Sequence, residues 1–191
     1  MNERFAVAGK GLWFLFLGEI LALAAVVAMI IPIIGWVAAP FMAIAGLVLA
    51  IYGPYAARTA HSNFQNAFYI AIVSLVLGIV SSFVPDEGML AGLVSILSDV
   101  LGFLSAYFIC TAAGELLAEK GDTEQAARAD LIWKLVGGCR AVSILCTLIG
   151  WVPVVGAVVG VVGVIAGIVS VVALVLEIIF YYKASASLKA A

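Results

Sequence analysis

Long apolar runs, separated by short breaks, make up most of this chain. Each run exceeds the roughly 20 residues that an α-helix needs to cross the hydrocarbon core of a bilayer, which is about 30 Å thick. The pattern therefore predicts an all-α, polytopic membrane bundle of about six transmembrane helices, in a single membrane domain covering residues 1–191. The expected spans are 11–31, 36–58, 64–84, 88–118, 127–149 and 154–182.

The breaks group these spans into pairs. Proline, glycine or acidic residues fill the connection inside each pair, at residues 32–35, 85–88 and 150–153. Before the last pair, Gly121 suits a left-handed helix C-cap, and Asp122 with Gln125 three residues later matches the capping-box pattern. We therefore expect three helical hairpins, at about 11–58, 64–118 and 127–182.

Composition points to the bilayer as the solvent for most of the chain. Hydrophobic residues make up 66% of it, charged residues 10%, and the mean hydropathy is +1.27. Soluble domains have about 45–50% apolar and about 25% charged residues. The net charge of -2 argues against nucleic acid as a partner, and the three cysteines, all in apolar segments, argue against a disulfide framework.

The first apolar run, residues 12–34, is too long for the apolar region of a cleaved signal peptide, which has about 7–15 residues. We expect it to be retained as a helix.

The basic residues fall on one side of the predicted bundle. With six spans, eight of the nine lie at the N-terminus, in the second and fourth loops and at the C-terminus, while Arg140 lies inside the fifth span. The positive-inside rule therefore predicts a multi-pass protein of the cytoplasmic membrane with both termini in the cytoplasm. The nine are Arg4, Lys10, Arg58, Lys120, Arg128, Lys134, Arg140, Lys183 and Lys189. All six tyrosines fall near the same side, as an interfacial aromatic belt would.

The first and third hairpins are alike in sequence. Residues 32–48 read PIIGWVAAPFMAIAGLV, and residues 153–169 read PVVGAVVGVVGVIAGIV, at a constant offset of 121. This predicts a parallel internal repeat, because an even number of spans separates the copies. The alternative is that helices rich in Gly, Ala and Val align by composition. Upstream, at an offset of 120, the matching pairs are Trp13 with Trp133 and Gly18 with Gly138.

Small residues form a stripe along the sixth span. The spacing of 4, 3, 4 and 3 places them on one helix face, where they allow helices to approach closely in lipid. Tight helix packing is the first interpretation of this glycine zipper, and a pore lining or a subunit seam is the functional alternative. The stripe consists of Gly156, Gly160, Gly163, Gly167 and Ser170.

Four ionisable residues lie inside the spans, where charge is costly and usually faces protein or water. Glu19 and Arg140 are also 121 residues apart, so they should sit at similar depth on equivalent helices. We expect an intramembrane ion pair between them, with either a packing or a transport role. Glu177 is near enough to the cytoplasmic interface to snorkel or to pair with Lys183.

The fourth of these residues, Asp99, lies about three turns into the fourth span, with no basic residue expected at its depth. An isolated carboxylate there would be protonated, hydrated, or bound to a cation or a ligand amine. The alternative is a protonated carboxyl hydrogen-bonded to serines of the third span, at Ser74, Ser81 or Ser82. The candidate ligand-binding residues in the outer half are Asp99, Ser95, Ser98, Trp36 and Trp151.

The sequence offers no catalytic constellation, and we expect no enzyme, cofactor or metal site. The one histidine, His61, lies in a short loop beside Arg58 and is expected to be solvated. Metal sites built from His and Cys need several ligands, and Cys139 and Cys146 on one helix face are only two. No phosphate-binding glycine loop follows a strand, because no strand is predicted.

Hairpins with a Pro-Ile-Ile-Gly-like turn and a glycine-rich second helix, seen best in residues 131–182, resemble uncharacterised prokaryotic multi-pass proteins with domains of unknown function. That resemblance implies no activity. In length and span number the chain is also similar to the substrate-binding subunits of energy-coupling-factor vitamin transporters. Two functions stay open: binding or transport of a small solute or cation, and a non-catalytic membrane interaction protein, either a homo-oligomer or a partner subunit.

Overall fold

The computed structural model describes residues 3–31, 34–85, 88–150 and 156–190 as an all-α bundle. Within these residues, six helices are long and apolar enough to cross a bilayer, so the prediction of a six-span membrane bundle in three hairpins is confirmed. The helices are α1 (Glu3–Ala28), α2 (Ile34–Ala57), α3 (Ser62–Ser81), α4 (Met89–Lys120), α5 (Thr123–Gly150) and α6 (Gly156–Lys189).

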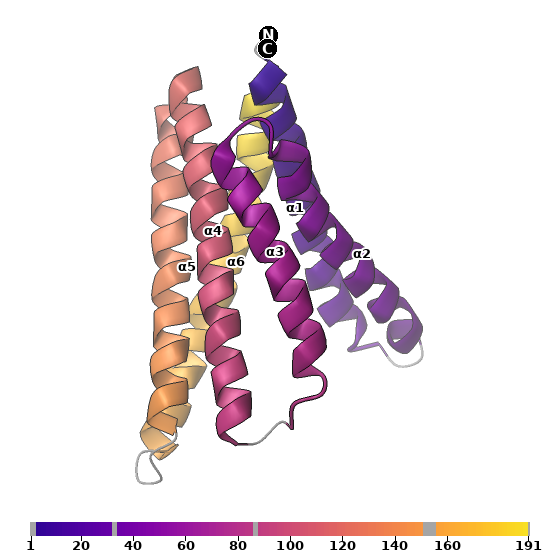
Figure 1. Ribbon diagram of the computed structural model, residues 1–191, viewed down its shortest axis with the longest axis vertical. Helices are drawn as coiled ribbons and strands as arrows, with labels where there is room; N and C mark the ends of the chain where they lie inside the picture. Colours follow the sequence, from indigo (N-terminus) through magenta and orange to yellow (C-terminus); the bar gives the residue numbers. More distant parts are fainter. Residues whose placement is uncertain (1–2, 32–33, 86–87, 151–155, 191) are drawn as a thin grey trace.

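The helices form a closed ring in chain order. Each helix packs against the next one in sequence, α6 returns to pack against α1, and α4 also touches α6. Figure 1 shows both ends of the chain at the same end of the bundle, which we call the termini end. Its cytoplasmic location, inferred from the basic residues, stays a prediction. The ring places one side of every helix toward a common interior.

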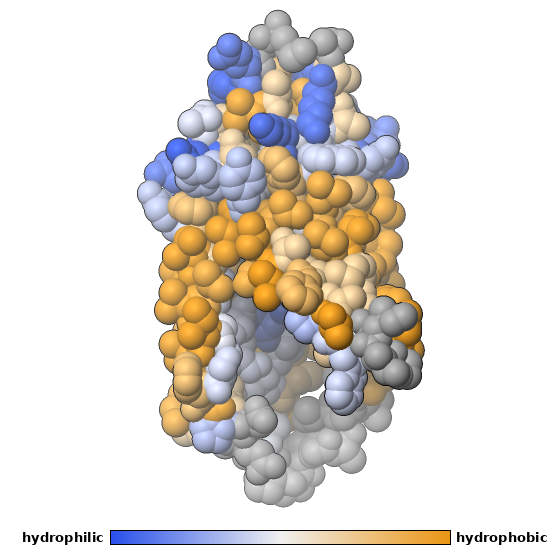
Figure 2. Space-filling view, turned by 90° about the vertical axis from the view of Figure 1, so that its right-hand side faces the viewer, coloured by the Kyte–Doolittle hydropathy of each residue, from blue (hydrophilic) through white to orange (hydrophobic). Residues whose placement is uncertain are grey.

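The outer surface matches a lipid environment. Figure 2 shows hydrophilic residues gathered at the termini end, above a broad apolar surface. Large apolar side chains stay exposed along the helices, among them Val26, Ile30, Phe41, Ile79 and Ile168. In water this exposure would be a liability, whereas lipid tails solvate such side chains.

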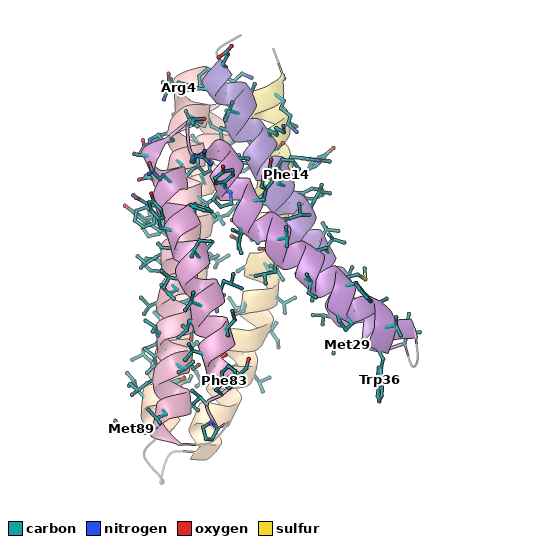
Figure 3. The ribbon with its side chains drawn as sticks, turned by 45° about the vertical axis from the view of Figure 1, so that its right-hand side comes forward. Arg4, Phe14, Met29, Trp36, Phe83 and Met89 are labelled. Carbon is teal, nitrogen blue, oxygen red and sulfur yellow. The ribbon has the colours of Figure 1, made fainter. Side chains whose placement is uncertain are left out.

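The buried core lies between the termini end and the middle of the bundle. Alanines from all six helices are almost fully buried there, and the small side chains let larger ones pack between them. The largest of these buried groups are Leu12, Phe64, Leu116, Phe180, Tyr181 and Leu188. Toward the other end, the tip of the first hairpin, marked by Met29 and Trp36, lies apart from the tip of the second, marked by Phe83 and Met89 (Figure 3).

Hydrogen bonds join α6 to α1 and α4 at the termini end. Ser185 donates a hydrogen bond to the carbonyl of Gly9 over 2.7 Å, joining α6 to α1. Lys120, at the end of α4, donates to the carbonyls of Ser187 and Ala190 near the end of α6. The two Lys120 bonds satisfy backbone carbonyls at the end of α6, which have no partner inside the helix.

The α4–α5 turn follows the cap signals in the sequence. Gly121 adopts a φ of 91° in the left-handed region. The amide of Asp122 donates to the carbonyl of Leu117, and that of Gly121 to the carbonyl of Ala118, which together form a Schellman motif. Asp122 Oδ1 accepts from the amide of Gln125 over 3.1 Å and caps α5. Because the Asp122 amide is already bonded to Leu117, it is not free for the reciprocal half of a capping box.

Glycines set the close approach of α1 and α2. A Cβ atom on Gly18 would lie 3.0 Å from the Gly46 carbonyl oxygen, and one on Gly46 would lie 3.0 Å from the Gly18 oxygen. This reciprocal contact allows backbone to meet backbone. At the termini end, a Cβ on Gly11 would lie 2.6 Å from both the Ala57 Cβ and the Gly53 oxygen. The first hairpin therefore depends on residues without side chains.

The matching glycines of the third hairpin are placed differently. A Cβ on Gly138 or on Gly167, the counterparts of Gly18 and Gly46, would meet nothing within 4 Å, and the same holds for Gly163. The tight packing predicted for the glycine zipper of α6 is therefore not found at its described members Gly163 and Gly167. The two hairpins share a glycine pattern, but in the third hairpin these glycines lie against open space.

Gly11→Ala should lower the melting temperature of the detergent-solubilised protein. The new Cβ would force α1 and α2 apart, at a cost on the order of 1–3 kcal/mol. Gly138→Ala is the matched control, because its Cβ enters open space and alanine has the higher helix propensity, by about 1 kcal/mol. Equal melting temperatures for the two variants would contradict the packing described for α1 and α2.

Ser187→Ala should raise the pKa of Asp122 toward its ordinary value. The Ser187 hydroxyl donates to Asp122 Oδ2 over 2.6 Å, and this bond, with that from the Gln125 amide, holds the pKa of the Asp122 carboxyl below its usual range. A lowered folded-state pKa means that the stabilisation is present above the unfolded-state pKa of about 3.9 and is lost as pH falls through the folded-state pKa.

Carbon-detected NMR titration of the Asp122 carboxyl would measure this change. Ser185→Ala is the control, because Ser185 bonds to Gly9 and not to Asp122. An Asp122 titration curve that Ser187→Ala leaves in place would show that the Ser187 hydroxyl does not set it.

Candidate functional site

A cavity of about 560 Å³ lies inside the ring, beyond the buried core. Residues from all six helices line it, so the interior that the ring creates is not filled by side chains. Figure 2 shows a hollow in the apolar surface with hydrophilic atoms at its bottom. The polar lining residues are Glu19, Ser74, Ser82, Ser105, Arg140, Glu177 and Tyr181.

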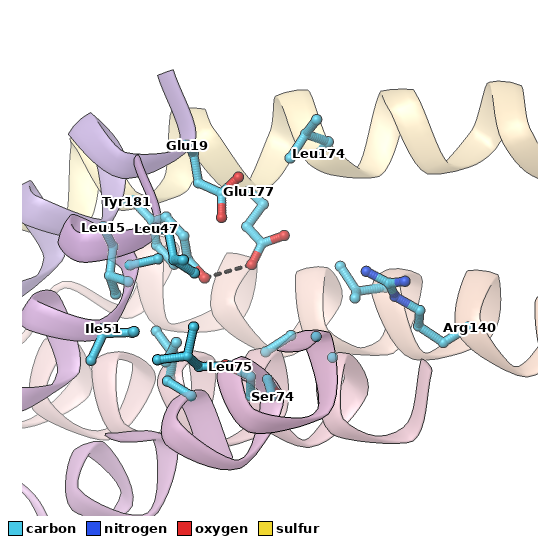
Figure 4. A pocket seen from close by; sticks show the side chains of 18 of the residues that line it. Leu15, Glu19, Leu47, Ile51, Ser74, Leu75, Arg140, Leu174, Glu177 and Tyr181 are labelled. Carbon is cyan, nitrogen blue, oxygen red and sulfur yellow. Dashed lines mark hydrogen bonds between the residues drawn. The ribbon is translucent and has the colours of Figure 1, made fainter. Parts of the chain in front are cut away.

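Two carboxyl groups face each other across the α1–α6 contact. Glu19 comes from α1 and Glu177 from α6, and Figure 4 shows both side chains turned into the cavity. The Tyr181 hydroxyl, one turn beyond Glu177, donates a hydrogen bond to Glu177 Oε1 over 2.5 Å. Glu19 lies within electrostatic range of both Glu177 and Arg140. Within the described residues, Glu19 forms no hydrogen bond and no ion pair.

Arg140 approaches this region from α5 but is held by α4. Its Nη1 lies 2.8 Å from Asp99 Oδ1, and a Cβ on Gly102 would lie 3.3 Å from the guanidinium. Gly102 therefore leaves room for the guanidinium beside Asp99, one turn away on the same helix. Because the guanidinium is planar and carries several donors, its contacts with Asp99 and Gly102 fix its orientation.

The prediction that Arg140 forms its ion pair with Glu19 was wrong. The ion pair is with Asp99, not Glu19, although Glu19 and Arg140 line the same cavity. The sequence interpretation also left Asp99 without a basic residue at its depth. Asp99 lies ten residues after the start of α4, and Arg140 lies ten residues before the end of α5. The two backbone positions are therefore at similar depth on neighbouring antiparallel helices.

The outer-half ligand set does not come together. Asp99 is 6% exposed and serves as the partner of Arg140, while Ser95 and Ser98 are exposed on α4. Trp36 is 81% exposed near the start of α2, and Trp151 lies outside the described residues. None of the described members lines the central cavity.

The alternative prediction, that serines of the third span hydrogen-bond to Asp99, was also wrong, because the partner of Asp99 is the arginine. The hydroxyls of Ser81 and Ser82 donate to the carbonyl of Gly78, within their own helix. Ser74 lines the cavity instead.

Glu177 is the functional candidate that the sequence interpretation placed too close to the interface. The structure puts it in the cavity beside Glu19, with Tyr181 as its hydrogen-bond partner. Glu19 lies six residues after Trp13, and Glu177 lies five residues before Tyr182, a tyrosine of the predicted belt. In the structure the rings of Trp13 and Tyr182 pack with their centroids 6.1 Å apart. Because α1 and α6 run in opposite directions, this contact together with the two spacings places both carboxyls at similar depth.

His61 has a structural role at the termini end. Its Nδ1 accepts a hydrogen bond from the amide of Asn63 and caps α3, while its Nε2 lies 2.8 Å from Glu115 Oε2 on α4. An acceptor at Nδ1 leaves the proton on Nε2, so the ring donates to Glu115. The expectation of a merely solvated histidine was wrong, because the short loop brings the ring against α4.

The cavity contains more negative than positive groups. Asp99 and Arg140 balance each other, while Glu19 and Glu177 have only the Tyr181 hydroxyl as a hydrogen-bond donor among the described residues. Within the described part of the chain, no three His, Cys, Asp or Glu side chains converge as metal ligands. The arrangement is suited to holding a proton or a positively charged solute between two carboxyl groups.

Asp99→Asn and Arg140→Gln should each lower the free energy of unfolding, because each single change leaves one charge without its partner. The double variant should be less destabilised than either single variant, with a coupling energy of about 1–3 kcal/mol between the two positions. Thermal unfolding in detergent would measure the cycle. The matched control is the exposed pair Glu124–Arg128, where about 0.5 kcal/mol is expected. Additive effects at Asp99 and Arg140 would show that the contact carries no energy.

Comparison with known proteins found no match to this chain. The chain matches no family model, no curated protein and no solved structure, so its resemblance to prokaryotic membrane proteins of unknown function stays a prediction. The functional argument therefore depends on the site itself, in an integral membrane protein with six candidate spans.

Proposed function

We propose that this integral membrane protein binds a small solute in its central cavity and carries it across the bilayer. One observation carries the proposal: a cavity of about 560 Å³, lined by all six helices, holds Glu19 and Glu177, and neither forms an ion pair with a cationic side chain in the part of the chain that the structure describes. Ligand sites in proteins have volumes of about 300–1,000 Å³ and combine apolar walls with a few polar groups. The lining of this cavity has that character.

The cost of charge in the bilayer supports a role beyond packing. Ionisable side chains inside spans are expensive and mark solute or proton pathways by default. Packing alone would be served better by apolar residues at positions 19 and 177, since the neighbouring Leu15 and Leu174 fill the same wall. The two carboxyl groups therefore argue for a bound partner.

The shape of the bundle supports access from one side. The buried core closes the termini end, and the first two hairpins diverge at the other end (Figure 3). With the termini in the cytoplasm, solute would enter from the outer side. Release to the cytoplasm would require the ring to open at the termini end, where the Ser185–Gly9 and His61–Glu115 contacts join different helices. Transporters commonly alternate between two such states.

Cysteine labelling tests whether the cavity is wet. In a background with Cys110, Cys139 and Cys146 replaced by alanine, Ser74→Cys should react with a membrane-impermeant, charged methanethiosulfonate at least about ten times faster than Val76→Cys, because thiolates form in water and not in lipid. Val76 is the matched control, since it lies half a turn away on α3 and is exposed on the outer surface. Equal rates would contradict a hydrated cavity.

A non-catalytic interaction protein is the second candidate function. The observation in its favour is the open surroundings of Gly138, Gly163 and Gly167. The counterparts of Gly138 and Gly167 in the first hairpin, Gly18 and Gly46, pack tightly. A helix of another subunit could approach there. A dry cavity in the labelling experiment, together with a stable complex in native membranes, would favour this function over transport.

A further inference from the structure

We propose that the cavity takes an organic cation and releases a proton when the cation binds. The proposal rests on the solute-binding function above and adds the chemical class of the solute and the ion for which it exchanges. It follows from the charges facing the cavity, the hydrogen-bonding capacity around them and the apolar remainder of the lining.

The charges on each element leave two carboxyl groups to be balanced. Helix α1 contributes Glu19, α6 contributes Glu177, and α5 contributes Arg140, which is bound to Asp99 of α4. The lining residues of α2 and α3 carry no charge. With the Arg140–Asp99 pair neutral, Glu19 and Glu177 need positive charge from a proton or from a ligand.

Hydrogen bonding inside the protein does not replace that positive charge. A tyrosine has one proton to donate, and that of Tyr181 goes to Glu177 Oε1. The described residues provide no donor to Glu19, and the hydroxyl of Ser82 is used by the Gly78 carbonyl. The carboxyl oxygens of Glu19 therefore face the cavity ready to accept from a ligand.

The remaining walls suit an apolar body. Aliphatic side chains from all six helices surround the carboxyl groups, and the hollow opens within the apolar surface (Figure 2). A hydrated metal ion would leave these walls in contact with water, whereas an amine or quaternary ammonium with an apolar substituent would cover them. The apolar lining residues are Leu15, Leu47, Ile51, Leu75, Ile79, Ile109, Val136 and Leu174.

Exchange with protons follows from charge balance. In the empty cavity a proton held on Glu19 or Glu177 lowers the negative charge, and a bound cation does the same. When the cation enters, the carboxyl O–H bond breaks, its electron pair stays on the carboxylate beside the cation, and the proton leaves to water. The same reaction run on opposite sides of the membrane exchanges cation for proton.

Benzyltrimethylammonium is a suitable probe, because its charge does not change with pH. Calorimetry with the detergent-purified full chain should show binding that tightens up to about tenfold per pH unit and releases about one proton per cation. Its neutral carbon analogue neopentylbenzene, and phenylacetate as the anion, should bind at least about tenfold more weakly. The double variant Glu19→Gln with Glu177→Gln should lose both the binding and the proton release.

The control neutralises two carboxyl groups outside the cavity. Glu119→Gln with Glu124→Gln removes the same charge from the termini end and should leave cation binding unchanged. Because Gln is close in shape to Glu, folding of the cavity variant can be checked by its melting temperature. The number of protons released per bound cation is measured on the protein without substitutions, so the proposal stays testable if the cavity variant is unstable.

Three results would overturn the proposal, each in a different way. Tight binding of phenylacetate or neopentylbenzene would leave solute binding standing and reject the cation. Cation binding without pH dependence or proton release would reject the exchange. Binding of none of the three probes would reject the organic cation, and unreactive Ser74→Cys would then reject the hydrated cavity as well.

Discussion

Charge in the middle of a bilayer has to be surrounded by protein, and the arrangement of this bundle follows from that constraint. Glu19, Asp99, Arg140 and Glu177 stand on four different helices and turn toward one interior. A ring of six helices provides such an interior, because each helix offers one side to it and the opposite side to lipid. Figure 4 shows the outcome, with two carboxyl groups beside a tyrosine and an arginine on the far wall.

The position of the cavity along the bundle is set by small residues. At the termini end, alanines and the glycines of α1 and α2 bring backbones close enough to exclude a cavity. Toward their tips the first two hairpins diverge (Figure 3), and the cavity that Glu19 and Glu177 line lies inside the ring. The polar groups therefore sit where close packing ends, which is also where a solute would have room.

Two hairpins with related glycine patterns pack in different ways. Gly18 and Gly46 meet across α1 and α2, whereas Gly138 and Gly167 on α5 and α6 face open space. The difference agrees with their neighbours, because α5 carries Arg140 toward α4 and packs on both α4 and α6. A glycine pattern provides the possibility of close approach, and the other contacts of each helix decide whether that approach occurs.

Span length and the breaks at proline, glycine and acidic residues are local properties, so the helices, their number and their pairing could be predicted from the order of residues alone. The same holds for the Gly121 and Asp122 caps, which act within one turn. The pairing of Arg140 with Asp99, and the meeting of Glu177 and Glu19 in a cavity, became visible in the folded bundle and not in the sequence. Hydropathy gives the depth of a side chain, whereas its partner depends on helix rotation and side-chain reach, which are set by contacts between segments distant in the chain.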